Sequence, residues 1–142
     1  MNKLELSPTD RKLAALLIKS FRVNYNNQAT KITNDVVVRK VRERGYKFSG
    51  AKFRNLLGTI RHHDLATPGF IVSDNEGYWY TEDIQDMRTF WESQRGRVIE
   101  IMKNVHPLYE RFKMNPQQLL LEFLEQLEQR IPTPETSEPA IQ

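Results

Sequence analysis

The sequence contains no cysteine, and this absence excludes disulfide bonds, thiolate nucleophiles and cysteine-based zinc sites. It also lacks any apolar run near the roughly 20 residues that a membrane-spanning helix needs. Residues 1–6 do not show the charged-then-apolar order of a signal peptide. Its 142 residues, 39% hydrophobic and 27% charged, fit one compact domain with appendages. We therefore expect a cytoplasmic protein with no membrane partner.

Residue patterns typical of catalysis are missing as well. No phosphate-binding loop, nucleophile triad or pair of suitably spaced carboxylates occurs in the sequence. His62 and His63 are neighbours, and adjacent side chains on a helix point about 100° apart, so they are poorly placed to share a metal ion. The sequence therefore predicts no enzyme activity, no cofactor and no metal site.

Charge is distributed unevenly along the chain. Residues 1–63 hold fourteen Lys and Arg against four acids, a net charge of +10. Residues 64–142 hold seven basic residues against fourteen acids, a net charge of −7. Chance clustering is the plain alternative, but a difference this large favours a basic surface that attracts nucleic acid.

Two helices are predicted before residue 46. Ser7 caps the first and Pro8 opens it, since proline at the first helical position loses no hydrogen bond. The second begins at Thr33 or Asn34 and ends at Gly45, because glycine adopts the left-handed conformation without penalty. The apolar residues that recur at helical spacing in these two helices are Leu13, Ala14, Leu17, Ile18, Phe21, Val36, Val37 and Val41.

A third helix is predicted from its cap at Ser49 to about His63. One narrow face is apolar and consists of Phe53, Leu56, Leu57 and Ile60. The opposite face is small and polar and consists of Ala51, Asn55, Gly58, Thr59 and His62. Its flanks are basic and carry Lys52, Arg54 and Arg61. One side of this helix therefore belongs to the core, and the other is available to a partner.

Two short β-favouring runs, residues 70–73 and 78–81, flank the turn sequence Asp74-Asn75-Glu76-Gly77 and predict a hairpin. Three helices followed by a two-stranded hairpin is the order of a winged helix, an elaborated helix-turn-helix. The sequence therefore predicts a mainly α fold with a small β-hairpin. Residues 1–81 form a winged helix-turn-helix DNA-binding domain in this interpretation, and a C-terminal helical extension follows.

The third helix is the predicted recognition helix, since helix-turn-helix proteins insert this element into the major groove. Asn55 could pair with adenine, Arg54 or Lys52 with guanine, and Thr59 could contact a thymine methyl group. Backbone N–H groups at the helix start suit a phosphate, and Gly58 leaves room for close approach. An ordinary solvated face is the alternative. The predicted contacts to double-stranded DNA are Lys47, Ser49, Gly50, Lys52, Arg54, Asn55, Thr59, Arg61 and His62.

The hairpin is the predicted wing, but its tip carries Asp74 and Glu76 and no Lys or Arg. Acids repel phosphates, so we do not expect this wing to hold DNA in the usual way. Tyr78, Trp79 and Tyr80 could stack on bases of a single strand. The favoured alternative is that they close the core, with Trp79 on the opposite face from the two tyrosines.

A longer helix is predicted from Thr81, whose side chain caps it. Its apolar positions alternate by three and four, with one polar interruption: Ile84, Met87, Trp91, Gln94, Val98, Ile101, Val105, Leu108 and Phe112. Such a heptad seam is typical of a coiled coil with another chain. Packing on the domain core is the alternative, and we favour it for the first two turns. Pro107 is expected to kink or end the helix near Val105.

A last helix is predicted from Asn115-Pro116, with an apolar stripe of Leu120, Phe123, Leu124, Leu127 and Ile131. It either folds back as a helical hairpin or docks on a partner. Residues 82–131 are therefore predicted to be a helical extension, and residues 84–131 the region for a homodimer or a protein partner. Residues 132–142 are rich in proline and acids and are predicted to be a disordered tail.

A resemblance rests on Phe48-Ser49-Gly50-Ala51-Lys52-Phe53-Arg54 through Ile60-Arg61, then Ile71-Val72-Ser73, Gly77-Tyr78-Trp79-Tyr80 and Arg95-Gly96-Arg97-Val98. These segments, within about Lys31 to Met102, resemble a family of small bacteriophage and mobile-element winged helix-turn-helix DNA-binding proteins. The chain departs from that family at the acidic tip and at Phe53, where the family has a smaller aliphatic residue. The resemblance implies a role in phage replication or transcription control, in the cytoplasm of a bacterial host.

Three functions are consistent with these patterns. The first is a non-enzymatic protein that binds double-stranded DNA and regulates transcription or replication. The second is a winged-helix adaptor that binds host or phage replication or transcription proteins. The third is single-stranded nucleic-acid binding through the aromatic hairpin. Charge reversal on the third helix separates the first two, and competition by single strands separates the third.

Overall fold

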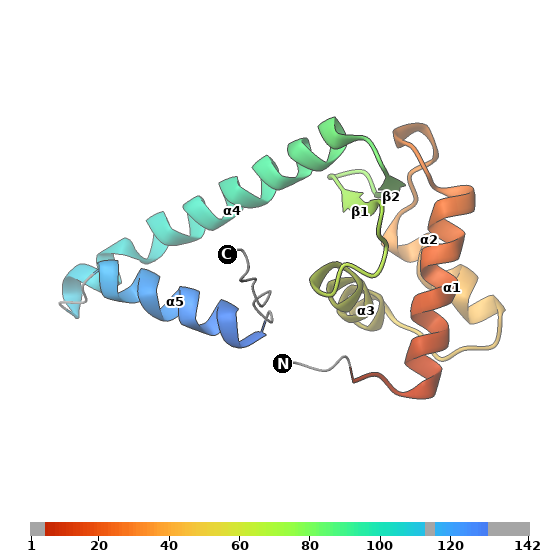
Figure 1. The fold of residues 1–142 in the computed structure, drawn as a ribbon, viewed down its shortest axis with the longest axis horizontal. Coiled ribbons are helices and arrows are strands. Elements are labelled where there is room, and N and C mark those ends of the chain that lie inside the picture. The colour runs from red at the N-terminus through yellow and green to blue at the C-terminus, as the bar shows by residue number, and fades with distance from the viewer. Residues whose placement is uncertain (1–4, 113–115, 131–142) are drawn as a thin grey trace, which may run out of the picture. The chain divides into compact units, whose positions relative to one another are not determined.

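The computed structural model describes residues 5–112 and 116–130 and is mainly helical, with one small antiparallel sheet. In chain order the elements are α1 (Pro8–Asn24), the 3₁₀ turn η1 (Gln28–Thr30), α2 (Asn34–Glu43), α3 (Gly50–His62), β1 (Phe70–Ser73), β2 (Tyr78–Thr81), α4 (Ile84–Arg111) and α5 (Pro116–Arg130) (Figure 1). The predicted order of three helices, a hairpin and two further helices is confirmed. The predicted tail, 132–142, lies outside the described residues, as does Ile131 of the predicted last stripe.

Local hydrogen bonds explain where the first helices begin and end. The side chains of Ser7, Thr33 and Ser49 each accept a bond from the backbone N–H three residues further on, at 3.1, 3.4 and 3.1 Å. These caps are the predicted ones. Gly45 follows α2 with φ +93°, the left-handed conformation expected of it.

Helices α1, α2 and α3 and the hairpin bury one apolar cluster. Phe53 lies at its centre with none of its surface exposed, stacked on Phe21 at 6.5 Å between ring centroids and met edge-on by Tyr78 at 5.1 Å. The predicted core residues of α3, namely Phe53, Leu56, Leu57 and Ile60, are all buried. Phe53, where the chain departs from the family that it resembles, therefore fills the middle of this core.

The hairpin pairs Phe70 with Thr81 and Ser73 with Tyr78 at its two ends. Tyr78 also exchanges both backbone hydrogen bonds with Ile32, at 2.8 and 2.9 Å, so the segment after η1 extends the sheet by one bridge. A Cβ on Gly77 would lie 2.8 Å from the carbonyl oxygen of Ile32, and glycine is therefore required by this close approach.

The aromatic side chains of β2 close the core, as the favoured interpretation predicted. Tyr80 belongs to the apolar cluster and Tyr78 packs against it, whereas Trp79 is buried on the opposite face of the hairpin. There the indole lies under the ammonium group of Lys31, at 4.9 Å from the ring centroid. Because Trp79 and Tyr80 are each only 5% exposed, they offer no free surface for stacking bases.

Helix α4 begins at Ile84, three residues later than predicted, so the predicted cap at Thr81 is wrong. Thr81 is the last residue of β2 and is held in the ladder opposite Phe70. Its hydroxyl accepts from the backbone N–H of Asp83 at 2.9 Å, and the carboxylate of Asp83 accepts from the N–H of Gln85 at 2.9 Å. The capping carboxylate is therefore that of Asp83.

The first turns of α4 are held to the hairpin through Asp86. The favoured packing of the apolar seam on the domain core is wrong for Ile84 and Trp91, which are 70% and 61% exposed. The carboxylate of Asp86 accepts hydrogen bonds from Trp79 Nε1 at 3.2 Å, Thr81 Oγ1 at 2.9 Å and Gln28 Nε2 at 3.1 Å. The compact unit consequently runs from Leu6 to Gln94, beyond the predicted boundary at residue 81. The residues from Arg95 onward belong to a second unit.

Helix α4 does not end at Pro107 but continues to Arg111. Proline removes one backbone N–H and its hydrogen bond to the carbonyl of Lys103, four residues earlier. Only one turn of helix follows Pro107, so little of the helix depends on that lost bond. Of the two outcomes expected near Val105, a kink or a helix end, the helix end is therefore wrong.

Arg61 joins α3 to the hairpin and to α4. Its Nε donates to the carbonyl of Ile71 at 2.9 Å, and its guanidinium carbon lies 4.7 Å from the ring centroid of Phe90 and 5.9 Å from that of Phe70. Burial lowers the pKa of Arg61 to about 10, which still leaves the group charged at neutral pH. The Arg61 side chain thus connects α3, the hairpin and α4.

We predict that Arg61→Ala lowers the free energy of unfolding by about 2–3 kcal/mol, because the Ile71 carbonyl and two aromatic faces lose their partner. Urea denaturation measures the change. Arg54→Ala, two turns earlier on the same helix and exposed, is the matched control and should change stability by less than about 0.5 kcal/mol. Equal effects of the two variants would contradict the structural role of Arg61.

We predict that the stabilising effect of Asp86 depends on pH. Partial burial alone would raise the pKa of Asp86, but the hydrogen bonds from Trp79, Thr81 and Gln28 outweigh it and hold the pKa below its ordinary 3.8. A depressed carboxyl pKa gives stability that is complete above pH 3.8 and is lost as pH falls through the lower, folded value.

Asp86→Asn should therefore be less stable than the wild type by about 1 kcal/mol at neutral pH, and this gap should narrow below pH 3.8. Thermal unfolding at several pH values measures it. Glu92→Gln, an exposed acid on the same helix, controls for the loss of one charge. A gap that stays constant down to pH 2.5 or so would refute the hydrogen-bonded carboxylate as its source.

Candidate nucleic-acid interface

The outward side of α3 is open. Ala51, Asn55, Gly58 and His62 are exposed at successive turns, and a Cβ added at Gly58 would meet no atom within 4 Å. These residues lie opposite the buried phenylalanine and leucines of the same helix. The face that the sequence singled out as polar and small is therefore the face that the domain leaves to solvent.

Arg54 is the cation that the structure leaves beside this face. Its side chain is exposed and forms no ion pair with any residue in the described part of the chain. One guanidinium nitrogen reaches back over the start of α3, 3.3 Å from the position a Cβ on Gly50 would take. The charge of Arg54 therefore adds to the positive end of the α3 helix dipole.

Arg54 also borders a groove between α2 and the start of α3. The groove has a volume of about 720 Å³ and is lined by Asn34, Asp35, Val38, Arg39, Arg42, Glu43, Gly50 and Arg54. Three arginines against two acids leave it with a net positive charge. The Nδ2 of Asn34 is buried there and has no hydrogen-bond partner among the described residues. A spare donor, a helix start and an excess of arginine suit a phosphate group.

Sequence reasoning missed this groove. The predicted second helix carries Arg39, Arg42 and Arg44, but nothing in their spacing indicates which part of α3 they face. The turn between the helices supplies that information, since Arg42 Nε donates to the carbonyl of Phe48 at 2.7 Å and so holds the turn against α2. The available signal was Asn34 at a helix start with Arg39 five residues and Arg42 eight residues later.

Lys52 lies on the flank of α3 that faces α1. Its ammonium group pairs with the carboxylate of Asp10 at 2.8 Å, and both side chains are partly buried. The sequence grouped Lys52 with Arg54 as a guanine contact. Lys52 is engaged by a carboxylate within the domain, so its charge is less available than that of Arg54.

Arg61 must be removed from the predicted DNA contacts. It lies seven residues, almost two full turns, from Arg54 and therefore on the same flank of α3. At that end of the helix, however, the flank is covered by β1, and the guanidinium bonds to the backbone of Ile71 and, at 3.4 Å, to the hydroxyl of Ser73. Helical spacing alone could not show which end the hairpin covers.

The other predicted contacts differ in whether their polar groups already form hydrogen bonds within the domain. The Ser49 hydroxyl is occupied as the cap of α3. The hydroxyl of Thr59 donates to the carbonyl of Asn55 at 3.2 Å, which leaves its methyl group for apolar contact. Lys47 and His62 are exposed at the two ends of α3, and the His62 ring lies 5.0 Å from that of His63.

The acidic tip of the hairpin serves the domain itself. Asp74 and Glu76 both pair with Lys31, at 2.7 and 3.1 Å. The two carboxylates raise the pKa of Lys31, and its ammonium group in turn helps to hold the pKa of Asp74 low, although burial opposes this. These acids therefore tie the segment before α2 to the hairpin, and the tip carries no surplus cation for a phosphate.

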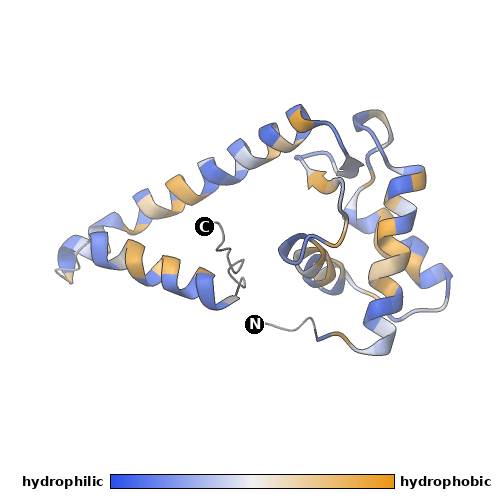
Figure 2. Cartoon of the chain, in the orientation of Figure 1, coloured by the Kyte–Doolittle hydropathy of each residue, from blue (hydrophilic) through white to orange (hydrophobic). Residues whose placement is uncertain are grey.

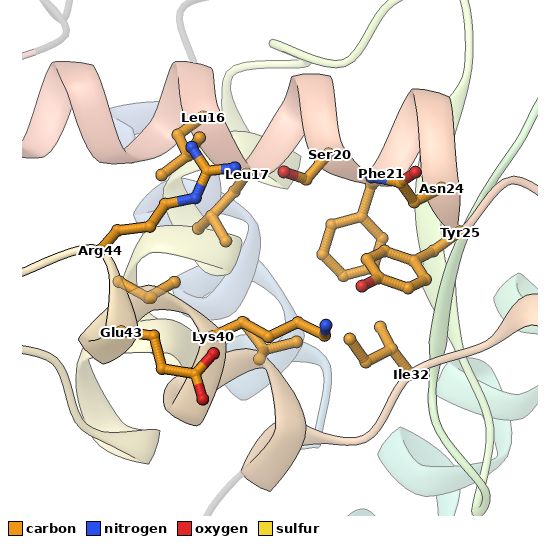
Figure 3. A pocket seen from close by; sticks show the side chains of 12 residues that line it. Leu16, Leu17, Ser20, Phe21, Asn24, Tyr25, Ile32, Lys40, Glu43 and Arg44 are labelled. Atoms are coloured by element: carbon orange, nitrogen blue, oxygen red, sulfur yellow. The ribbon is translucent and has the colours of Figure 1, made fainter.

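A second hollow lies between α1 and α2 (Figure 3). It measures about 300 Å³, with Leu17, Phe21 and Ile32 on its floor and Lys40 and Arg44 at its edge. That volume is at the lower limit of small-molecule sites. The polar groups at its edge come from opposite sides and include Glu43, so they do not present one charge to a ligand.

Two further properties of the described residues bear on the site. No three His, Asp or Glu side chains gather closely enough there to hold a metal ion. None of the described helices combines the length and apolarity needed to cross a bilayer.

The chain matches no protein-family model, no curated protein and no solved structure.

Proposed function

We propose that the Leu6–Gln94 unit is a winged helix-turn-helix that binds double-stranded DNA and regulates transcription or replication without catalysing a reaction. In this proposal α2 and α3 are the helix-turn-helix, α3 enters the major groove, and the β1–β2 hairpin is the wing. The phage or mobile-element setting rests on the resemblance of residues 31–102 alone.

The observation that carries the proposal is the pairing of an open polar face on α3 with a basic groove at its start. Asn55 and the open position at Gly58 face outward, so a base edge can approach the helix closely. An exposed asparagine amide matches the donor and acceptor pattern of adenine in the major groove. In this proposal Arg54, which borders the groove, contacts either guanine or the phosphate backbone.

The groove gives the proposal its phosphate contact. Arg39, Arg54 and the unpartnered Nδ2 of Asn34 are cationic or donor groups around the first backbone N–H groups of α3. Phosphate contacts position a protein on the duplex, and base contacts specify the sequence. The net charge of +10 on residues 1–63 supports attraction to a polyanion.

We predict that the protein binds random-sequence double-stranded DNA and that affinity falls at least tenfold between about 50 and 200 mM salt. Fluorescence anisotropy measures both. Arg39→Glu and Arg54→Glu should each weaken binding about tenfold or more and lower the salt slope by about one. Lys19→Glu, the same charge change at an exposed residue of α1, is the control and should have a much smaller effect.

Each alternative function has its own outcome in this experiment. No binding at low salt would reject the DNA proposal and favour an adaptor that uses the helices after the hairpin. Equal losses for Lys19→Glu and Arg54→Glu would mean that only net charge matters. Displacement by unlabelled single strands at equal concentration would favour single-strand binding, which the buried Trp79 and Tyr80 speak against.

A further inference from the structure

Helix α4 leaves a long apolar seam uncovered. No side chain of the helix is buried, and Ile84, Trp91, Val98, Ile101 and Leu108 are 46–70% exposed. Figure 2 shows the apolar residues recurring along α4 between hydrophilic ones. A soluble monomer rarely exposes apolar surface so continuously, and such a surface commonly marks an interface.

The seam follows a heptad repeat from residue 84 to residue 112. Ile84, Trp91, Val98, Val105 and Phe112 occupy the first core position of each heptad, and Met87, Gln94, Ile101 and Leu108 occupy the second. Three of the five first-position residues are β-branched, as in parallel two-stranded coiled coils, although only Leu108 supplies the leucine that these have at the second position. Only Met87, Gln94 and Val105 of the whole seam are even partly covered within the chain.

The chain's own α5 is too short to cover this seam. Its 15 residues span about 22 Å, whereas the 28 residues of α4 span about 42 Å. Because α5 follows α4 after four residues, folding back would bring it only to about the middle of α4. Ile84 and Trp91, which are 70% and 61% exposed, would lie beyond its reach, whereas a second copy of α4 matches the seam over its whole length.

The charges beside the seam are compatible with a second copy in parallel register. The positions that flank the core hold Arg88, Arg95, Arg97 and Arg111, so some pairing registers would bring arginines of the two chains together. In a parallel, in-register pair, the flanking residue just before each first core position contacts the residue five positions later on the other chain, which lies just after a second core position. By sequence position Arg88 then lies opposite Asp83, the residue that caps α4, Arg95 opposite Phe90 and Arg97 opposite Met102, so no arginine lies opposite another.

Gln94 and Pro107 fit the same arrangement. In parallel register Gln94 faces its own copy, where two amides can hydrogen-bond, while in an antiparallel pair it would face an apolar residue. Pro107 and Lys103, the residue whose carbonyl loses its helical partner to proline, both occupy outer positions of the repeat. Neither residue interrupts the apolar layers around Val98 and Ile101.

We propose that α4 pairs with α4 of a second copy as a parallel, in-register coiled coil from Ile84 to Phe112, with Gln94 meeting Gln94 at its polar layer. The inference does not rest on DNA binding, since it concerns another helix and is tested without nucleic acid.

The full chain should sediment at twice its 16.8 kDa in equilibrium ultracentrifugation. Ile101→Asp should raise the dimer dissociation constant at least about tenfold, because it places a charge in an apolar layer. Val23→Asp, at a residue of α1 that is 64% exposed, is the matched control and should leave the dimer intact. A wild-type mass of 16.8 kDa at every concentration reached would overturn the proposal.

The absence of natural cysteine allows a test of register. Gln94→Cys should form a disulfide-linked dimer under mild oxidation, because the two thiols meet in parallel register. Glu100→Cys, on the exposed outer side of the same helix, should stay uncrosslinked. Equal crosslinking of both variants, or a dimer without crosslinking of Gln94→Cys, would reject the in-register pair.

Discussion

The guanidinium of Arg61 is the interaction on which the arrangement of the Leu6–Gln94 unit depends. It bonds to the backbone of β1 and lies against the rings of Phe70 and Phe90, so α3, the hairpin and α4 are joined at one cation. This contact holds the hairpin and the start of α4 against α3. The buried face of Phe53, Leu56, Leu57 and Ile60 then leaves the opposite face, with Asn55, Gly58 and His62, to solvent.

Charge pairing within the domain narrows the surface that remains for a polyanion. Lys31 is held by Asp74 and Glu76, Lys52 by Asp10, and Arg61 by the hairpin. Part of the basic excess in residues 1–63 therefore serves the fold. What stays outward on this side is the open face of α3 with Arg54 and the arginine-lined groove beside it.

Sequence periodicity was sufficient to predict the helices, the hairpin and the core of α3, because these depend on local caps and on repeats of apolar residues. It could not show that Thr81 is bound in the sheet and that Asp83 therefore caps α4. It also could not separate Arg54 from Arg61. The two share one flank of a helix, and only the tertiary position of β1 makes one exposed and the other internal.

The proposed DNA interface involves α2 and α3, and the proposed helix pair involves α4. The hairpin is followed directly by α4, whose first turns are held by Asp86 and Phe90, and the uncovered seam begins at the same residues. Pairing of α4 would therefore bring two copies of the Leu6–Gln94 unit into one molecule. If each unit binds DNA as proposed, a dimer that reads two half-sites gains affinity.

The most direct test of the DNA-binding account is a titration of the ¹⁵N-labelled protein with a short DNA duplex, followed by amide chemical shifts. If α3 and the groove at its start bind DNA, the largest shifts occur at Asn34, Gly50, Arg54, Asn55 and Gly58, and α1 residues near Val23 change little. Shifts confined to the hairpin or to α4 and α5 would contradict it.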